Sequence, residues 1–141
     1  MTVPLVLLDT NVLVAGLRSR NGAAFRLLSL VGTGHFEICL SVPVVLEYEA
    51  VLLGQLEQLL LAASDVCDLL DYFCSVGKQH EVHYLWRPYL RDPKDDLILE
   101  AAVAGNCESI ITYNRRDFRG AEKFGVKILT PGEFLKRIGG L

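Results

Sequence analysis

The sequence predicts a single α/β domain with three layers, in which helices cover both faces of a mostly parallel sheet of four to five strands. Short apolar runs alternate with longer helical patterns along the chain, which is typical of parallel strands joined by crossover helices. The chain has 141 residues, the usual size of one domain, and 51% of them are hydrophobic. No linker or internal repeat interrupts the pattern, so we expect residues 1–141 to form one domain.

The first predicted strand is the apolar run Leu5–Leu8, which ends in Asp9. A short continuous apolar run indicates a strand that is buried on both faces. Thr10 and Asn11 follow at once, and both residue types are preferred at helix starts. Asp9 would then lie at the carboxyl end of a buried strand, the edge at which parallel α/β sheets bind ligands. The alternative is that Asp9 only caps the helix.

A helix and a second strand come next, followed by a helix that carries two glutamates. Apolar residues at helical spacing predict a helix over Ala23–Val31, and Phe36–Leu40 is the second strand. Ser41 then opens a helix that runs to about Leu53 and has a proline in its first turn.

Glu47 and Glu49 lie in the otherwise apolar sequence of this third helix. A carboxylate in such a helix is costly unless it is paired or bound to a cation. At least one of the two is therefore a candidate ligand, and the periodicity alone does not choose between them.

The rest of the chain continues the alternation. The predicted elements are a helix over Glu57–Val76, a weak strand over Glu81–Leu85, a helix over Asp95–Gly105, a strand over Glu108–Thr112, a strand over Gly125–Leu129 and a helix over Gly132–Ile138. Asp95 and Asp96 begin an almost wholly apolar helix, where they complement its dipole. The loop Tyr113–Asp117 follows a strand end, as Asp9 does.

Right-handed crossovers would bring the carboxyl ends of all these strands to one edge of the sheet. The polar residues expected there are Asp9, Glu47, Asp95 or Asp96, Asn114 and Asp117. Mg²⁺ prefers carboxylate oxygens and keeps several waters. A cation held there can polarise a phosphodiester and lower the pKa of an attacking water. The pattern therefore predicts metal-dependent phosphoryl chemistry.

Composition argues against several other classes of protein. The four cysteines form no CxxC pair, and the three histidines do not complete a zinc pattern. We find no signal peptide and no apolar run near the roughly 18 residues of a membrane span, so we expect a cytoplasmic protein with no membrane partner. The net charge of −3 argues against nucleic acid, but the charged residues within 27–86 are almost all acidic, and the basic residues lie towards the two chain ends.

Four segments together carry a family resemblance: LLDTNVL, SVPVVLEYEAVL, DPKDDLILEAAVAGNCESIIT and YNRRDF. They span residues 5 to 130 in an order and spacing that resemble the PIN-domain family, and are similar to the VapC-type toxin ribonucleases of prokaryotic toxin–antitoxin pairs. The resemblance implies a Rossmann-like α/β/α fold and an endoribonuclease that cleaves single-stranded RNA. It also implies Mg²⁺ or Mn²⁺ as cofactor, a homodimer and a cognate antitoxin.

The resemblance also implies roles for individual residues. Matching positions make Asp9, Glu47 and one of Asp95 and Asp96 the principal acids, with Asp117 as the fourth. We expect the cation on Asp9, on Asp95 or Asp96, and on Asp117, with Glu47 orienting the water or a second metal. Thr10 and Asn114 are the expected supporting polar groups. Arg115 and Arg116 are expected to contact RNA phosphates, and Arg18 and Arg20 are weaker candidates for such contacts. Asn114 stands where many relatives have an acid.

Two other functions compete with this reading. A non-catalytic PIN-like module that binds RNA or a protein would keep the same acids as structural cation ligands. A response-type nucleotide-binding α/β domain would also use acids at strand ends, but it needs a lysine at the end of its last strand. Lys127 lies within the fifth predicted strand instead, so we favour the nuclease.

Overall fold

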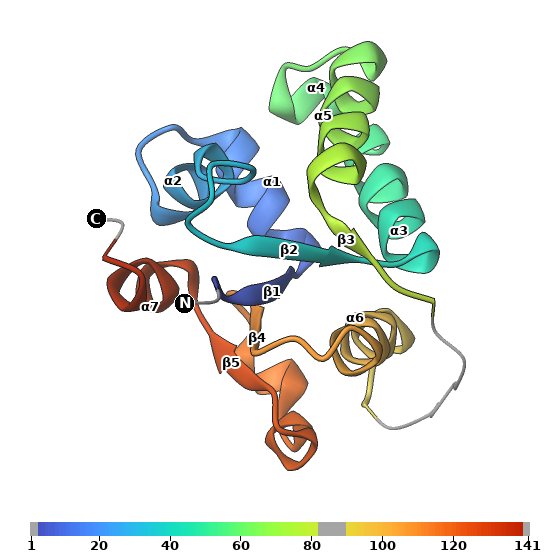
Figure 1. The fold of residues 1–141 in the computed structure, drawn as a ribbon. Helices are drawn as coiled ribbons and strands as arrows, with labels where there is room; N and C mark the ends of the chain where they lie inside the picture. The colour runs from blue at the N-terminus through green and yellow to red at the C-terminus, as the bar shows by residue number, and fades with distance from the viewer. Residues whose placement is uncertain (1–2, 82–89, 140–141) are drawn as a thin grey trace.

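The computed structural model describes residues 3–81 and 90–139, and it confirms the predicted α/β/α architecture. Five parallel strands form one sheet in the order β3-β2-β1-β4-β5 (Figure 1). The strands are β1 (Leu5–Leu8), β2 (Glu37–Leu40), β3 (Lys78–Gln79), β4 (Ser109–Ile111) and β5 (Lys127–Leu129). The α-helices are α1 (Thr10–Arg18), α2 (Ala23–Ser29), α3 (Val42–Leu53), α4 (Leu56–Leu59), α5 (Ala63–Val76), α6 (Pro93–Ala104) and α7 (Pro131–Arg137).

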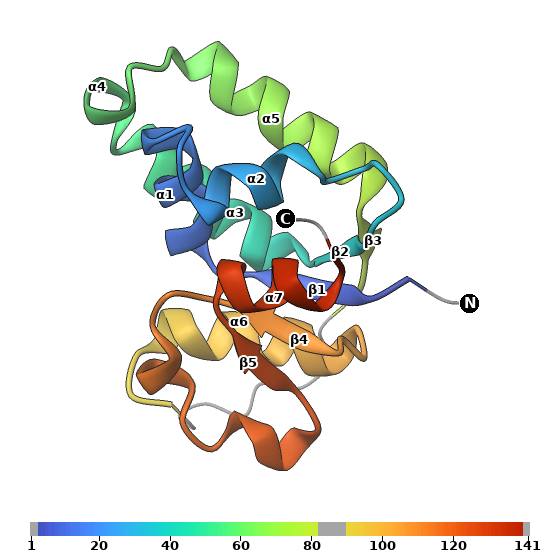
Figure 2. The ribbon, with the colours of Figure 1, turned by 90° about the vertical axis from the view of Figure 1, so that its left-hand side faces the viewer.

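Helices cover both faces of the sheet. In Figure 1, α1 to α5 lie above the strands and α6 lies below them, and the view turned by 90° in Figure 2 shows the same separation. Within the described ranges, each helix is too short or too polar to cross a membrane.

β1 is the central strand, which explains its continuous apolar sequence. Val6 and Leu7 are fully buried, because the strand is covered on both faces. Val6 pairs with Ser109 of β4 and Leu8 pairs with Ile111. The pairing continues one residue further, where the backbone N–H of Asp9 donates to the Ile111 carbonyl at 2.9 Å. The first acid is thus fixed at the carboxyl end of the sheet.

The strand order places a topological switch point between β1 and β4. The chain leaves β1 towards β2 and β3 on one side, whereas β4 and β5 lie on the other. At such a point the two connections diverge and leave a crevice at the carboxyl ends of the strands, where α/β proteins bind ligands. Asp9 follows β1, and Thr112 follows β4, so both residues lie at these carboxyl ends.

The third strand differs from the prediction. It comprises Lys78 and Gln79, which follow Gly77 directly and pair with Cys39 and Leu40 of β2. The predicted strand began at Glu81, which lies in no strand, and its residues 82–85 lie outside the described ranges. Because both residues of β3 are exposed and polar, they lack the apolar pattern that marks a buried strand.

Two other segments also differ. The single helix predicted over 57–76 is divided into α4 and α5, because Leu60 adopts a left-handed conformation with φ 57°. The predicted loop 113–117 contains the start of a 3₁₀ helix, η1 (Arg115–Phe118), and a second one, η2 (Ala121–Phe124), follows it. Phe118 is completely buried and anchors η1 against the domain.

Candidate active site

A cleft of about 390 Å³ lies at the carboxyl ends of β1 and β4. It gathers most of the residues that the sequence singled out, although they come from distant parts of the chain. Its lining includes Asp9, Thr10, Asn11, Arg18, Glu47, Asp92, Lys94, Asp95, Asn114 and Asp117. Asp96 and Arg20 do not line it, nor do Arg115 and Arg116.

Asp9 has a structural role and also faces the cleft. Its Oδ1 accepts a hydrogen bond from the backbone N–H of Thr10 at 2.8 Å, so Asp9 caps α1 as the alternative reading expected. Its Oδ2 accepts from the Thr112 hydroxyl at 2.7 Å. The residue is only 8% exposed. Two fixed donors therefore hold a nearly buried carboxylate at the floor of the cleft.

Thr112 joins the two strand ends and was not singled out from the sequence. Its hydroxyl donates to Asp9 and accepts from the backbone N–H of Asn114 at 3.0 Å and from the Asn11 side-chain amide at 3.3 Å. The Asn11 amide oxygen accepts in turn from the backbone N–H of Tyr113. Thr112 is completely buried, so this network fixes the position of Asp9 relative to β4. The only sequence signal was its place at the end of an apolar run.

The register of α3 decides between the two glutamates. Val44, Tyr48 and Leu52 point into the core at helical spacing, and the Tyr48 hydroxyl donates to the Leu8 carbonyl at the end of β1. This contact locks α3 beside the cleft and directs Glu47 into its lining. Glu49 is exposed and does not line the cleft.

A lysine lies beside Glu47 in the lining of the cleft. The Lys94 ammonium lies 3.6 Å from Glu47 Oε1, and Lys94 is 67% exposed whereas Glu47 is 15% exposed. The pair joins α3 to the first turn of α6, whose cap Asp92 also lines the cleft. Sequence reasoning assigned no role to Lys94, since a lysine in an acidic helix start has no distinctive pattern.

Asp95 and Asp96 have different surroundings. Asp96 is 2% exposed, and its Oδ1 accepts from the backbone N–H of Leu90 at 2.9 Å. Asp95 is half-buried and lines the cleft. The two consecutive acids therefore leave α6 in different directions, one into the protein and one into the cleft.

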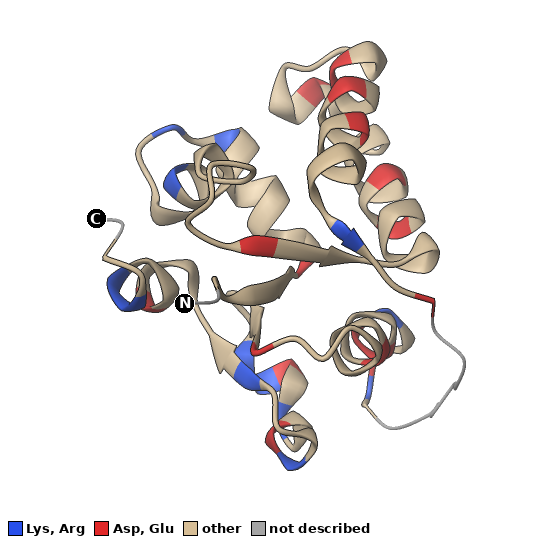
Figure 3. Ribbon diagram, in the orientation of Figure 1, with Lys and Arg blue, Asp and Glu red and all other residues tan. Residues whose placement is uncertain are grey.

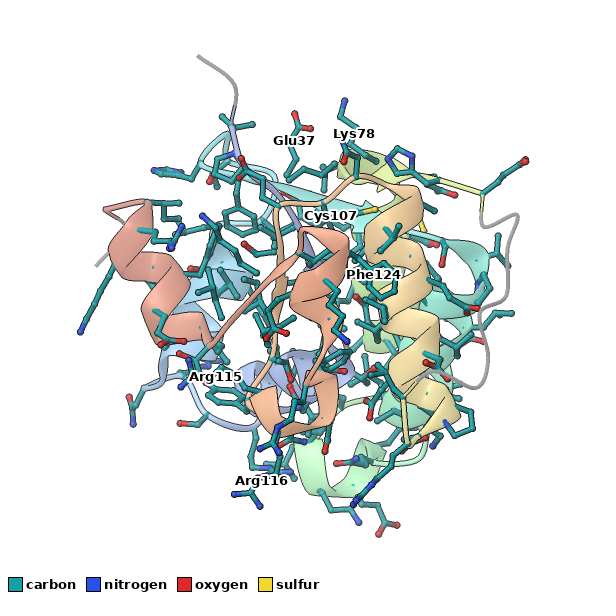
Figure 4. All side chains as sticks on the ribbon, turned by 90° about the horizontal axis from the view of Figure 1, so that it is seen from below. Glu37, Lys78, Cys107, Arg115, Arg116 and Phe124 are labelled. Carbon is teal, nitrogen blue, oxygen red and sulfur yellow. The ribbon has the colours of Figure 1, made fainter. Side chains whose placement is uncertain are left out.

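The loop that follows β4 supplies a further part of the cleft wall. Asn114 and Asp117 both line the cleft, and the Asp117 backbone N–H donates to the Asn114 carbonyl at 3.0 Å. Arg115 turns towards α7, where its guanidinium lies 3.0 Å from a Glu133 carboxylate oxygen. Figure 4 shows Arg115 and Arg116 on η1, with Arg116 further from α7.

The cleft concentrates negative charge, and the pKa values of its acids reflect this. Burial raises the pKa of Asp9, while the hydrogen bonds from Thr112 and Thr10 oppose that rise and the charges of Asp117 and Glu47 add to it. Burial, followed by the charges of Asp9 and Asp117, raises the pKa of Asp95 to about 7. A bound cation would relieve this repulsion.

The donor set suits a hard divalent cation. All five acids of the lining, Asp92 included, offer carboxylate oxygens, and Asn114 adds an amide to the lining. Within the part of the chain that the structure describes, no three acids, histidines or cysteines converge closely enough to enclose a metal ion. Mg²⁺ does not require such enclosure, because it is commonly held by one or two carboxylates and keeps its other waters.

Comparison with known proteins supports the fold. A comparison with curated proteins finds no match. Among solved structures, the crystal structure of VapBC2 from Rickettsia felis bound to a DNA fragment from their promoter has a similar fold. It superposes with a TM-score of 0.60 at 18% sequence identity, and the match covers 88% of this chain and 98% of that chain. The family model of the PIN domain matches residues 5–116, so this chain belongs to the PIN-domain family.

Proposed function

We propose that this protein is a metal-dependent endoribonuclease that hydrolyses phosphodiester bonds in single-stranded RNA. The observation that carries the proposal is the gathering of Asp9, Glu47, Asp95 and Asp117 in one cleft at the switch point of the sheet. Membership of the PIN-domain family supports it, because PIN domains are generally nucleases. The acids of the lining outnumber its two basic residues, Arg18 and Lys94, so the cleft attracts a cation and repels a phosphate that no cation neutralises.

Mg²⁺ or Mn²⁺ would supply Lewis-acid activation of the phosphodiester and of the attacking water when bound. Asp9 and Asp95 are the proposed direct ligands, and Asp117 would contribute through water. We propose Asp95 rather than Asp96, because the Asp96 carboxylate accepts from the Leu90 backbone and lies outside the cleft lining. Asn114 would stabilise the site from the wall formed by the strand-end loop.

The protein's own groups would orient the reaction. Glu47 lines the cleft from α3. Its carboxylate can accept a proton from a water molecule, or hold that water in position for attack on phosphorus. Thr112 would keep Asp9 from rotating by donating to its Oδ2. Thr10 contributes through its backbone N–H, which holds Asp9 Oδ1. These contacts would preorganise the acids before the substrate binds.

We further propose that the protein is the toxin of a cytoplasmic toxin–antitoxin pair and that it acts as a homodimer. The similarity to the VapBC2 structure supports an antitoxin partner. Large apolar side chains on α3 and at the end of α4 are exposed, namely Val42, Leu46, Leu53 and Leu60. Such side chains favour association with a second protein surface.

The test is cleavage of a mixed pool of single-stranded RNAs by wild type and by Asp9→Asn. Each is assayed with Mg²⁺, with Mn²⁺ and with chelator, after removal of any co-purified inhibitor. We expect wild type to cleave only with a divalent cation and Asp9→Asn to be inactive with an unchanged fold. A folded wild-type sample that cleaves under none of these conditions would instead support the non-catalytic binding module.

A further inference from the structure

A second pocket, of about 280 Å³, adjoins the acidic cleft and has a different charge. It is lined by Leu90, Arg91, Arg116, Asp117 and Arg119. Asp117 lines both the cleft and this pocket, so the two hollows share one wall. We call this second hollow the arginine pocket. It places three guanidinium groups beside the five carboxylates of the cleft.

Both segments that carry these arginines are fixed to the domain. Arg116 and Arg119 flank Phe118, which is completely buried, and the Arg119 backbone N–H donates to the Arg116 carbonyl at 3.3 Å. On the other segment, the backbone N–H of Leu90 donates to the buried Asp96 carboxylate at 2.9 Å. The contact that removes Asp96 from the cleft therefore also holds the residue next to Arg91.

The positive charge of the pocket is largely uncompensated. Within residues 3–81 and 90–139, no salt bridge involves Arg91, Arg116 or Arg119, whereas Arg115 is paired with Glu133. All three pocket arginines are exposed, which leaves them available to a ligand. Figure 3 shows basic positions on η1 and on the segment that enters α6, and acidic positions on α3 and α5 across the molecule.

We propose that the arginine pocket binds a backbone phosphate of the RNA strand, next to the phosphate that enters the acidic cleft. This inference rests on the proposed function and specifies how the substrate is held. The acidic cleft repels phosphates that are not neutralised by a cation, so affinity for the strand must come from flanking positive charge. Guanidinium groups suit this role, because their planar donors match phosphate oxygens.

The shared wall indicates where the strand would continue beyond the cleft. A strand with one phosphate on the cleft side of Asp117 would continue over η1, next to Arg116 and Arg119. A backbone phosphodiester and a carboxylate each carry one negative charge, so it is the wall shared with the acidic cleft, and not the charge of the pocket alone, that favours an RNA strand over a protein. An acidic protein segment is therefore the competing ligand that the experiment must exclude.

The first experiment measures binding of a short fluorescent single-stranded RNA over a range of salt concentrations. Chelator is present, so that metal-dependent cleavage does not occur. The variants are Arg91→Gln, Arg116→Gln and Arg119→Gln, and Arg137→Gln on α7 is the matched control with the same loss of charge. We expect the pocket variants to bind several-fold more weakly and to lower the salt slope by about 0.7 for each lost phosphate contact. The control should bind like wild type.

A second experiment locates the contact on the RNA. A neutral methylphosphonate replaces, in turn, the linkages that flank the cleaved position. In wild type, one flanking replacement should weaken binding several-fold, and in Arg116→Gln the same replacement should have a much smaller effect. Equal losses in both proteins would overturn the proposed contact. Equal RNA binding by wild type and all pocket variants, with loss of binding only to an acidic peptide, would overturn it in favour of a protein ligand.

The results separate this inference from the proposed function. Metal-dependent cleavage that is unaffected by the pocket variants would contradict the inference alone. Absence of cleavage, together with weaker RNA binding by the pocket variants, would contradict the nuclease proposal and retain the arginine pocket as an RNA-binding site.

Discussion

Asp95 and Asp96 are consecutive residues of α6, yet only Asp95 faces the cleft. Asp96 is buried and accepts a hydrogen bond from the Leu90 backbone, whereas Asp95 is half-buried near Asp9 and Asp117. One carboxylate therefore stabilises the start of the helix, and the other contributes negative charge to the cleft. This difference gives the two residues separable mutational effects.

Asp95→Asn should abolish cleavage without loss of stability, whereas Asp96→Ala should lower stability and retain cleavage. A metal ion contributes several kcal/mol to the transition state, so loss of its ligand should lower cleavage by at least about a hundredfold. Asp96→Ala leaves the buried Leu90 N–H without its acceptor, which should lower the free energy of unfolding by about 1–3 kcal/mol. Urea unfolding and RNA cleavage of both variants test this. An Asp96→Ala protein of wild-type stability would contradict the assignment.

Thr112→Val should loosen the acid that it positions. The variant keeps the shape of the side chain but removes the donor to Asp9 Oδ2 and the acceptor for Asn114. We expect a loss of about 1–3 kcal/mol in the free energy of unfolding. The pKa of Asp9 should rise further, because the Thr112 hydrogen bond lowers it. Carboxyl NMR titration measures this, and Thr112→Ser, which retains the hydroxyl, should restore the wild-type pKa.

The raised pKa of Asp95 predicts a particular dependence of stability on pH. Folding raises this pKa from 3.8 to about 7, so the folded protein binds the proton more tightly than the unfolded chain does. Its contribution is therefore most favourable below pH 3.8 and is lost as the pH rises through about 7. In chelator, wild type should lose thermal stability over this range relative to Asp95→Asn. Parallel pH curves for the two proteins would refute the prediction.

The raised pKa of Asp95 also predicts how cation binding depends on pH. Metal binding requires the charged carboxylate, so Mg²⁺ should stabilise wild type more strongly as the pH rises through about 7. Cleavage should increase over the same interval. Asp95→Asn should show neither increase in stabilisation nor increase in cleavage.

Lys94→Met should strengthen metal binding while leaving the fold intact. The Lys94 ammonium lies 3.6 Å from the Glu47 carboxylate, where it repels an incoming cation. Repulsion of about 1 kcal/mol in water corresponds to a few-fold change in Mn²⁺ affinity. Because Lys94 is largely exposed, its loss should change the free energy of unfolding by less than about 1 kcal/mol. Titration calorimetry with Mn²⁺ compares Lys94→Met with Lys94→Arg, which keeps the charge and should bind like wild type.

The elements that carry the site could be predicted because their signals are local. The apolar run before Asp9 and the polar residues after it mark a buried strand followed by a helix start, whatever the rest of the chain does. Parallel topology then brings Asp9 and the loop after β4 to the same edge, as Thr112 confirms by bonding to Asp9. This shared edge required only the alternation of elements and the handedness of crossovers, whereas the strand order was not predicted.

Other features depend on contacts that no local pattern specifies. The orientation of Asp95 relative to Asp96 is set by the Leu90 backbone, and Glu47 is selected over Glu49 by the contact of Tyr48 with β1. The break between α4 and α5 falls at Leu60, where neither glycine nor proline interrupts an apolar sequence. The Leu60 side chain is 91% exposed, so its own packing does not explain the break, and the helical periodicity gave no sign of it.

The most direct test of the proposed chemistry is RNA cleavage in ¹⁸O-labelled water, with the product ends identified by mass spectrometry. Wild type is compared with Asp9→Asn and Asp95→Asn, each with Mn²⁺ and with chelator. We predict that wild type with Mn²⁺ incorporates the label into a terminal phosphate, because water attacks phosphorus directly. Both variants and all chelated samples should give no product. Unlabelled 2′,3′-cyclic phosphate ends, formed with chelator present, would contradict hydrolysis by a metal–carboxylate site.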